Sequence, residues 1–255
     1  MKKAIFGVLV IVGFSAFLIL FAKSASAPSD SKQPESKPET ADITGNTTSF
    51  DKQANPIDQP DSIWWIVSKV RPISPASYAP SDLVVPNVLL RSGSGGSEMR
   101  LRQQPATALE KMIAAAKLEN INLMLVSGFR SYTTQVSVYN GWVQKYGQSG
   151  ADKISARPGT SEHQTGLAAD LGAVSRLCEL EACFGNLSEG KWLATNAHKY
   201  GFIVRYSEGK ESITGYDYEP WHMRFVGKEL SQEMNTQNNN TLEEFFGIVP
   251  ESQPY

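Results

Sequence analysis

The stretch SEHQTGLAAD at residues 161–170 and the shorter stretch EPWH at residues 219–222 hold two of the three histidines in this 255-residue chain. Each histidine lies within a few residues of a carboxylate, which is the composition of a hydrolytic zinc site. A catalytic zinc ion takes three protein ligands from histidine, carboxylate or thiolate groups and keeps a fourth position for water. Three residues of the two stretches meet this count: His163, Asp170 and His222.

A free carboxylate beside such an ion can take the proton of the attacking water and pass it to a leaving amine. Glu219, three residues before His222, is placed for this role. Side chains three residues apart on a flat strand point to opposite faces, so we expect a strand start or a bend at Pro220 that brings both to one side. The alternative is a structural zinc site, but such sites usually close all four positions, commonly with cysteine, and the two cysteines lie elsewhere.

The hydrophobic pattern of the chain predicts an α+β fold with a small central antiparallel sheet and flanking helices. Apolar residues at helical spacing or in short runs predict helices at residues 105–118, 131–146, 193–200 and 242–246 and strands at residues 121–126, 166–171, 202–206 and 221–226. The inner face of the second helix is expected to consist of core residues, namely Val136, Tyr139, Trp142 and Val143.

The N-terminus carries two lysines followed by a largely apolar run at residues 4–22. This run is long enough to cross a bilayer, which predicts a membrane anchor within residues 1–27, with a cytoplasmic N-terminus and an external C-terminus. The alternative is a secretion signal cleaved after Ala27, although Pro28 directly after the bond makes this a poor cleavage site.

Composition divides the rest of the chain into two parts. Residues 28–58 are rich in proline, serine, threonine and charged residues and are expected to form a disordered linker. Residues 59–255 have the length of one domain, the catalytic one. Beyond Lys23, 21 basic residues face 26 acidic ones, and this net charge of −5 argues against nucleic-acid binding. Cys178 and Cys183 either form a disulfide or remain two unpaired thiols. We expect a monomer.

The two histidine stretches follow the pattern Ser-x-His-x-x-Gly-x-Ala-x-Asp and then Glu-x-Trp-His, with SGFRS at residues 127–131 and TGY at residues 214–216 in the same order. In these motifs the chain resembles the VanY-type D-alanyl-D-alanine carboxypeptidases, zinc peptidases that trim the stem peptides of peptidoglycan. The resemblance covers roughly residues 60–250 and implies the hedgehog/DD-peptidase fold.

The resemblance implies a role for each matching residue. Glu219 is the general base, and the zinc ligands are His163, Asp170 and His222. Arg130 stabilises the oxyanion of the tetrahedral intermediate, a role that suits a permanently charged, planar guanidinium. Ser161 binds the terminal carboxylate of the substrate, and Gln135 belongs to the substrate pocket.

The expected function is therefore zinc-dependent removal of a C-terminal D-alanine from peptidoglycan stem peptides in the cell envelope. Three alternatives remain open. The chain can be an L,D-carboxypeptidase of the same fold, an endopeptidase of the wall, or a cell-wall-binding module with weak catalysis.

Overall fold

The computed structural model describes residues 50–92 and 96–248 of the chain. The predicted anchor at residues 1–27 and most of the predicted linker lie outside these ranges. Within them, no helix combines the length and the apolar character that crossing a membrane requires.

Four antiparallel strands form the central sheet, in the order β3-β4-β6-β5. These strands are β3 (Leu123–Ser127), β4 (Ala168–Ala173), β5 (Phe202–Tyr206) and β6 (Glu219–Phe225). A separate ribbon pairs β1 (Leu83–Val84) with β2 (Leu101–Arg102). The α+β fold with a small antiparallel sheet is thus confirmed, and each predicted strand overlaps an observed one.

Six α-helices surround the sheet in the described part of the chain: α1 (Gln103–Leu118), α2 (Tyr132–Ile154), α3 (Ser188–Asn196), α4 (Glu211–Thr214), α5 (Lys228–Thr236) and α6 (Leu242–Phe246). Short 3₁₀ turns join them: η1 (Gly96–Met99), η2 (Glu162–Thr165), η3 (Ala182–Asn186) and η4 (Ala197–Tyr200). The predicted helix at 193–200 is α3 running on into η4. Helix α5 was not predicted, because only Leu230 and Met234 give its mostly polar sequence a buried apolar side.

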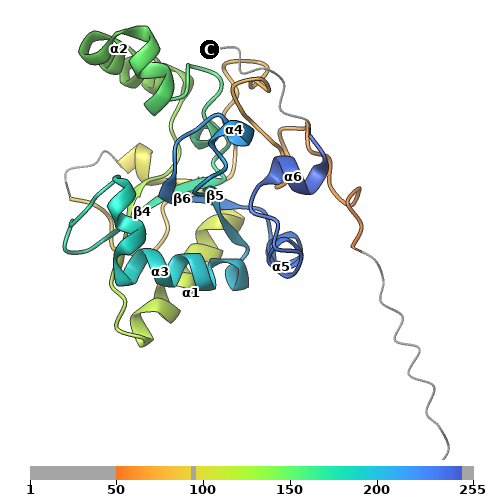
Figure 1. Cartoon of the computed structure of the whole chain (residues 1–255), viewed down its shortest axis with the longest axis vertical. Helices are drawn as coiled ribbons and strands as arrows, with labels where there is room; N and C mark the ends of the chain where they lie inside the picture. The colour runs from red at the N-terminus through yellow and green to blue at the C-terminus, as the bar shows by residue number, and fades with distance from the viewer. Residues whose placement is uncertain (1–49, 93–95, 249–255) are drawn as a thin grey trace, which may run out of the picture. The chain divides into compact units, whose positions relative to one another are not determined.

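The main core lies between the sheet and helices α1 and α3. Figure 1 shows these two helices on one side of the strands and α2 on the other. Leu109 and Met112 of α1, Leu193 of α3, and Leu171 and Met223 of the sheet are fully buried in one cluster. This packing holds β4 and β6 side by side, and these strands carry two of the predicted metal ligands.

The folded part begins before residue 59, where the predicted linker ends. Phe50 stacks on Trp64 with ring centroids 5.5 Å apart and meets Phe245 of α6 edge to face at 5.6 Å. The backbone N–H of Ile66 also donates to the carbonyl of Ile57. The predicted boundary is therefore too late, because an aromatic residue and a backbone pairing tie residues 50–58 to the domain.

Helix α2 differs from its prediction in length and in the face that it buries. It continues to Ile154 across a break at Gly147, whose φ of 72° lies in the left-handed region that glycine tolerates. Of the predicted inner face, Tyr139 is buried, whereas Val136, Trp142 and Val143 are only partly buried. Helical periodicity marks an apolar face correctly but does not say whether a core or a cleft lies against it.

Candidate metal centre and active-site cleft

The sheet brings Asp170 and His222 together by direct strand pairing. Asp170 of β4 stands opposite His222 of β6 in the antiparallel register, and side chains at such positions are neighbours on one face of the sheet. His163 comes from η2, the 3₁₀ turn that precedes β4, and Gly166 ends this turn with a φ of 69°. The chain enters β4 directly after this turn, and the His163 ring faces Asp170 of that strand.

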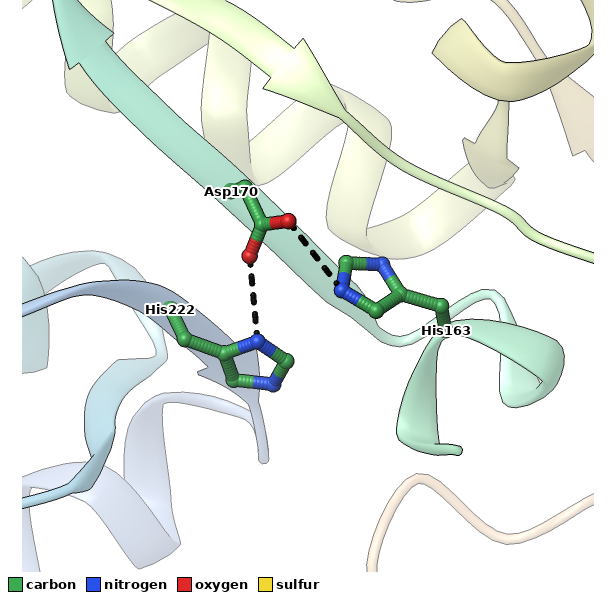
Figure 2. Close-up of side chains that lie close together, drawn as sticks. All are labelled: His163, Asp170 and His222. Carbon is green, nitrogen blue, oxygen red and sulfur yellow. Dashed lines mark hydrogen bonds and ion pairs between the residues drawn. The ribbon is translucent and has the colours of Figure 1, made fainter. Parts of the chain in front are cut away.

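The three side chains converge, as Figure 2 shows. The Nε2 atom of His163 lies 3.2 Å from one Asp170 oxygen, and the Nδ1 atom of His222 lies 3.0 Å from the other. One ligand atom from each residue fits within a 4.8 Å group. Ligand atoms bound tetrahedrally at ~2.0–2.1 Å stand about 3.3 Å apart. The spacing of this group therefore suits a zinc ion.

Contacts and burial shift the protonation of His163 and Asp170 in one direction and that of His222 in the other. The second ring nitrogen of His163, Nδ1, lies 2.6 Å from the carbonyl oxygen of Gly128, which leaves Nε2 as the free acceptor. Burial, together with the charge of Arg130, lowers the pKa of His163. Burial opposes ionisation of Asp170, but its contacts with both histidines outweigh that penalty and lower its pKa. A neutral imidazole and an ionised carboxylate are the forms that bind a metal. Burial disfavours the charged form of His222, but its hydrogen bonds with Asp170 and Glu162 raise its pKa to about 10, so His222 must release a proton when a metal binds.

Glu219 reaches the same side of the sheet as His222 because the ladder is irregular there. Between the pairs Val204–Met223 and Tyr206–Glu219, strand β6 spans more residues than β5. The bend expected at Pro220 is thus confirmed, and Glu219 Oε2 lies 3.7 Å from His222 Nδ1. Burial, with a smaller contribution from the charge of Asp170, raises the pKa of Glu219 to about 7. A carboxyl group with this pKa both takes up and releases a proton near neutral pH.

Arg130 lines the cleft over the group, and neutral side chains hold it. Its guanidinium donates to Gln135 Oε1 and to Ser127 Oγ, each at 3.1 Å. Gln135 is 1 % exposed, and its amide nitrogen donates to Ser155 and to the carbonyl of Ala156. Gln135 therefore lies against Arg130, and its part in the substrate pocket stays a prediction.

The cleft has a volume of about 950 Å³, and Ser161, Arg130 and the metal-site residues line it. Trp142 and Tyr146 of α2 also line the cleft, with their rings stacked 5.7 Å apart. Trp142 was expected in the core, and this expectation is wrong because its side of α2 faces the cleft.

A short loop contributes Leu180, Glu181 and Ala182 to the lining of the cleft. Cys178 and Cys183 form a disulfide at the base of this loop, with Cα atoms 5.6 Å apart. The pairing settles the choice between a disulfide and two thiols. It also means that neither cysteine offers a thiolate to a metal, although both lie near Glu181.

Three charged residues at the site were not predicted from the sequence: Glu162, Arg205 and Arg224. Glu162 is completely buried behind His222 and forms ion pairs of 2.8 Å with Arg205 of β5 and Arg224 of β6. A usable signal was present, because Arg205 and Arg224 lie inside predicted buried strands, where a charge needs a partner. The identity of that partner follows only from the three-dimensional arrangement.

The chain is similar to known proteins in sequence and in structure. Residues 98–228 match the VanY family, described as D-alanyl-D-alanine carboxypeptidase. YodJ of Bacillus subtilis (strain 168) is 44 % identical over 193 residues, which span 76 % of this chain and 70 % of YodJ.

Solved structures resemble the fold over most of the described chain. The LdcB LD-carboxypeptidase aligns with a TM-score of 0.69 and 44 % identity, covering 74 % of this chain and 88 % of that one. A vancomycin-resistance D,D-pentapeptidase VanY from a VanB-type cassette was solved as a mutant in complex with Zn(II). It aligns with a TM-score of 0.58 and 29 % identity, covering 71 % of this chain and 97 % of that one. The chain therefore belongs to the VanY family of D-alanyl-D-alanine carboxypeptidases.

Proposed function

We propose that this chain is a zinc-dependent carboxypeptidase that removes a C-terminal D-alanine from peptidoglycan stem peptides. The convergence of His163, Asp170 and His222 on one point, with Glu219 beside it, is the observation that carries the proposal. The membership of the VanY family and the Zn(II) complex of a relative support it.

In this proposal each ligand residue presents one atom to the metal: His163 through Nε2, His222 through Nδ1 and Asp170 through a carboxylate oxygen. A bound zinc ion would polarise the scissile carbonyl and lower the pKa of a bound water. Purified protein should contain about one zinc per chain, and a chelator should abolish its activity. Full activity after metal analysis has confirmed complete removal would refute the metallopeptidase.

Residues of the chain would move the protons and stabilise the charges. Glu219, whose Oε2 lies 3.7 Å from His222 Nδ1, takes a proton from the attacking water and returns it to the leaving amine. Arg130, held by Gln135 and Ser127, donates to the oxygen that becomes negative in the tetrahedral intermediate. Ser161 offers its hydroxyl to the terminal carboxylate of the substrate, and Gln135 acts through Arg130.

The C-terminal carboxylate of the substrate separates a carboxypeptidase from an endopeptidase. A hydrogen bond to a charged group contributes roughly 1.5–3 kcal/mol, or about ten- to a hundredfold in kcat/KM. Stem peptides ending in D-alanine should therefore lose one residue, and their C-terminal amides should be cut about ten- to a hundredfold more slowly. Equal cleavage of both, or release of longer fragments, would support the endopeptidase, and binding without cleavage would support the wall-binding module.

An L,D-carboxypeptidase is the second candidate, because the LdcB LD-carboxypeptidase shares 44 % of aligned residues with this chain and the VanY D,D-pentapeptidase shares 29 %. Two synthetic peptides distinguish the candidates: a pentapeptide ending in D-Ala-D-Ala, and a tetrapeptide in which D-alanine follows an L-configured centre. Mass spectrometry of the products shows which peptide loses D-alanine faster.

The proposed substrate places the enzyme outside the cytoplasm. The Cys178–Cys183 disulfide supports this location, since such bonds persist in oxidising compartments. Anchoring through residues 1–27 and the monomeric state remain predictions. Fractionation of cells followed by immunoblotting, and light scattering of the purified protein, test them.

A further inference from the structure

A buried network of four charges lies behind His222. Both Arg205 and Arg224 donate to Glu162 Oε1, each at 2.8 Å. Arg205 also forms a bidentate pair with Glu243 of α6, at 2.7 and 2.9 Å. The four residues are at most 5 % exposed, and two positive charges balance two negative ones.

Stability alone is a weak reason to keep such a network. Removing charges from water costs several kcal/mol per ion, and well-packed apolar residues in their place often give an equally stable or more stable protein. Arg224 also donates to the carbonyls of Ile63 and Trp65, at 3.1 and 2.7 Å. The network therefore fixes the orientation of the Glu162 carboxylate from several sides.

The second oxygen of Glu162 points at the candidate metal site. Oε2 lies 3.4 Å from Nε2 of His222, whereas the other ring nitrogen, Nδ1, faces Asp170 at 3.0 Å. A neutral imidazole has one N–H donor and one acceptor nitrogen. If Nδ1 is to bind a metal, the proton must lie on Nε2, and Glu162 Oε2 is placed to accept it.

We propose that Glu162 is a positioning residue that keeps the proton of His222 on Nε2 and so presents Nδ1 to the metal. Arg205 and Arg224 hold Glu162 for this task by occupying Oε1, which leaves Oε2 for the imidazole. The inference rests on the proposed zinc function and gives Glu162 the role at Nε2 of His222 that the Gly128 carbonyl has at Nδ1 of His163. Hydrogen-bonded partners of this kind fix the tautomer and ring orientation of metal-binding histidines.

The substitution Glu162→Gln tests this role with little change of shape. Two arginines on one side require the amide oxygen of glutamine to face them, so its NH₂ group faces Nε2 of His222. An NH₂ donor favours the tautomer with the proton on Nδ1, which opposes metal binding. The zinc dissociation constant should rise about 10- to 100-fold.

Glu243→Gln is the matched control. It removes one negative charge from the same network and weakens the same arginine, Arg205, but the described contacts of Glu243 do not include His222. Its zinc dissociation constant should stay within about twofold of the wild-type value. Competition with a chromophoric chelator measures zinc affinity in all three proteins, and urea unfolding of the chelated proteins measures the stability change separately.

An equal loss of zinc affinity in both variants would overturn the inference, because the network would then act only through general stability. Wild-type protein that binds no zinc would instead refute the proposed function. If Glu162→Gln does not fold, ¹H–¹⁵N NMR of the zinc-loaded wild type shows which ring nitrogen of His222 carries the proton. A proton on Nε2 of His222 supports the inference, and a proton on Nδ1 overturns it.

Discussion

Two glutamates contact opposite ring nitrogens of the same imidazole, and their carboxyl pKa values shift in opposite directions. Glu162 Oε2 lies 3.4 Å from Nε2 of His222, and Glu219 Oε2 lies 3.7 Å from Nδ1. Both residues line the cleft. Burial by itself favours the neutral carboxyl group and would raise the pKa of both residues. For Glu162 the charges of Arg205 and Arg224 outweigh burial and lower the pKa, whereas for Glu219 burial prevails and the pKa is about 7.

The number of nearby cations therefore decides what a buried carboxylate can do. Two arginines within ion-pair distance keep Glu162 ionised, so it can accept a hydrogen bond but cannot exchange a proton near neutral pH. Glu219 has no ion pair with an arginine or lysine among the described contacts, and its position allows proton transfer. We call Glu162 and its partners Arg205, Arg224 and Glu243 the orienting side of His222. Glu219, Arg130 and the three proposed ligands form the chemical side.

The largest expected effect is on the chemical side. Glu219→Gln removes the proton acceptor without removing a proposed ligand, so kcat should fall by about 10²- to 10⁴-fold while zinc content stays near one per chain. Kinetics with a stem peptide and metal analysis of the same preparation measure the two quantities. Loss of zinc from this variant would make Glu219 a ligand and would remove the contrast with Glu162.

The chemical side was also the part of the site that the sequence predicted best. His163, Asp170, His222 and Glu219 occur in two short motifs, and residue chemistry alone suggests a metal with a free base. The orienting side was missed because its members are far apart in the chain: the Glu162–Arg205 pair spans 43 residues, and the Glu162–Arg224 pair spans 62. Such partners are set by strand order and register, which local patterns do not specify.

The second effect concerns stability on the orienting side. Arg205→Met leaves Glu243 without its bidentate partner and removes one of the two cations at Glu162, and breaking a buried pair in this way costs about 3–5 kcal/mol. Lys210→Met breaks the Lys210–Glu244 pair, whose side chains are 26 % and 31 % exposed, and should cost under about 1 kcal/mol. Urea unfolding compares the two. Equal losses would show that the network behaves like a surface ion pair.

The fold divides in a similar way between predictable and unpredictable parts. Strand β5 and helix α6 match their predicted residues because short apolar runs bound them clearly. The burial of α2 was misjudged, since Trp142 has the same apolar character whether it contacts a core or lines a cleft. The early start of the folded part at Phe50 depends on Trp64 and Phe245, which only the tertiary structure brings together.

The third, smaller effect is on kcat and concerns Arg130, the cation on the chemical side. Arg130 is held by a serine and an amide rather than by a carboxylate, so its charge remains available to a developing oxyanion. Lysine keeps the charge but not the planar fork of donors, and Arg130→Lys should lower kcat by about 10- to 10³-fold with zinc content unchanged. A change confined to KM would make Arg130 a contact of the bound substrate instead.

The smallest effect follows from the raised pKa of Glu219, and protein freed of metal by a chelator shows it. The carboxyl group has an ordinary pKa of 4.5 in the unfolded chain and about 7 in the fold. Between these values the folded state binds more protons, so the free energy of unfolding falls as the pH rises through this interval and then levels off. The difference corresponds to at most about 3 kcal/mol, and because the side chain is 19 % exposed we expect about 1–2 kcal/mol. Glu219→Gln cannot ionise, so its stability relative to wild type should increase by that amount between pH 5 and pH 8, as measured by urea unfolding at both values. A constant difference would mean that Glu219 ionises in the fold as it does in water, and the contrast with Glu162 would then lie in position alone.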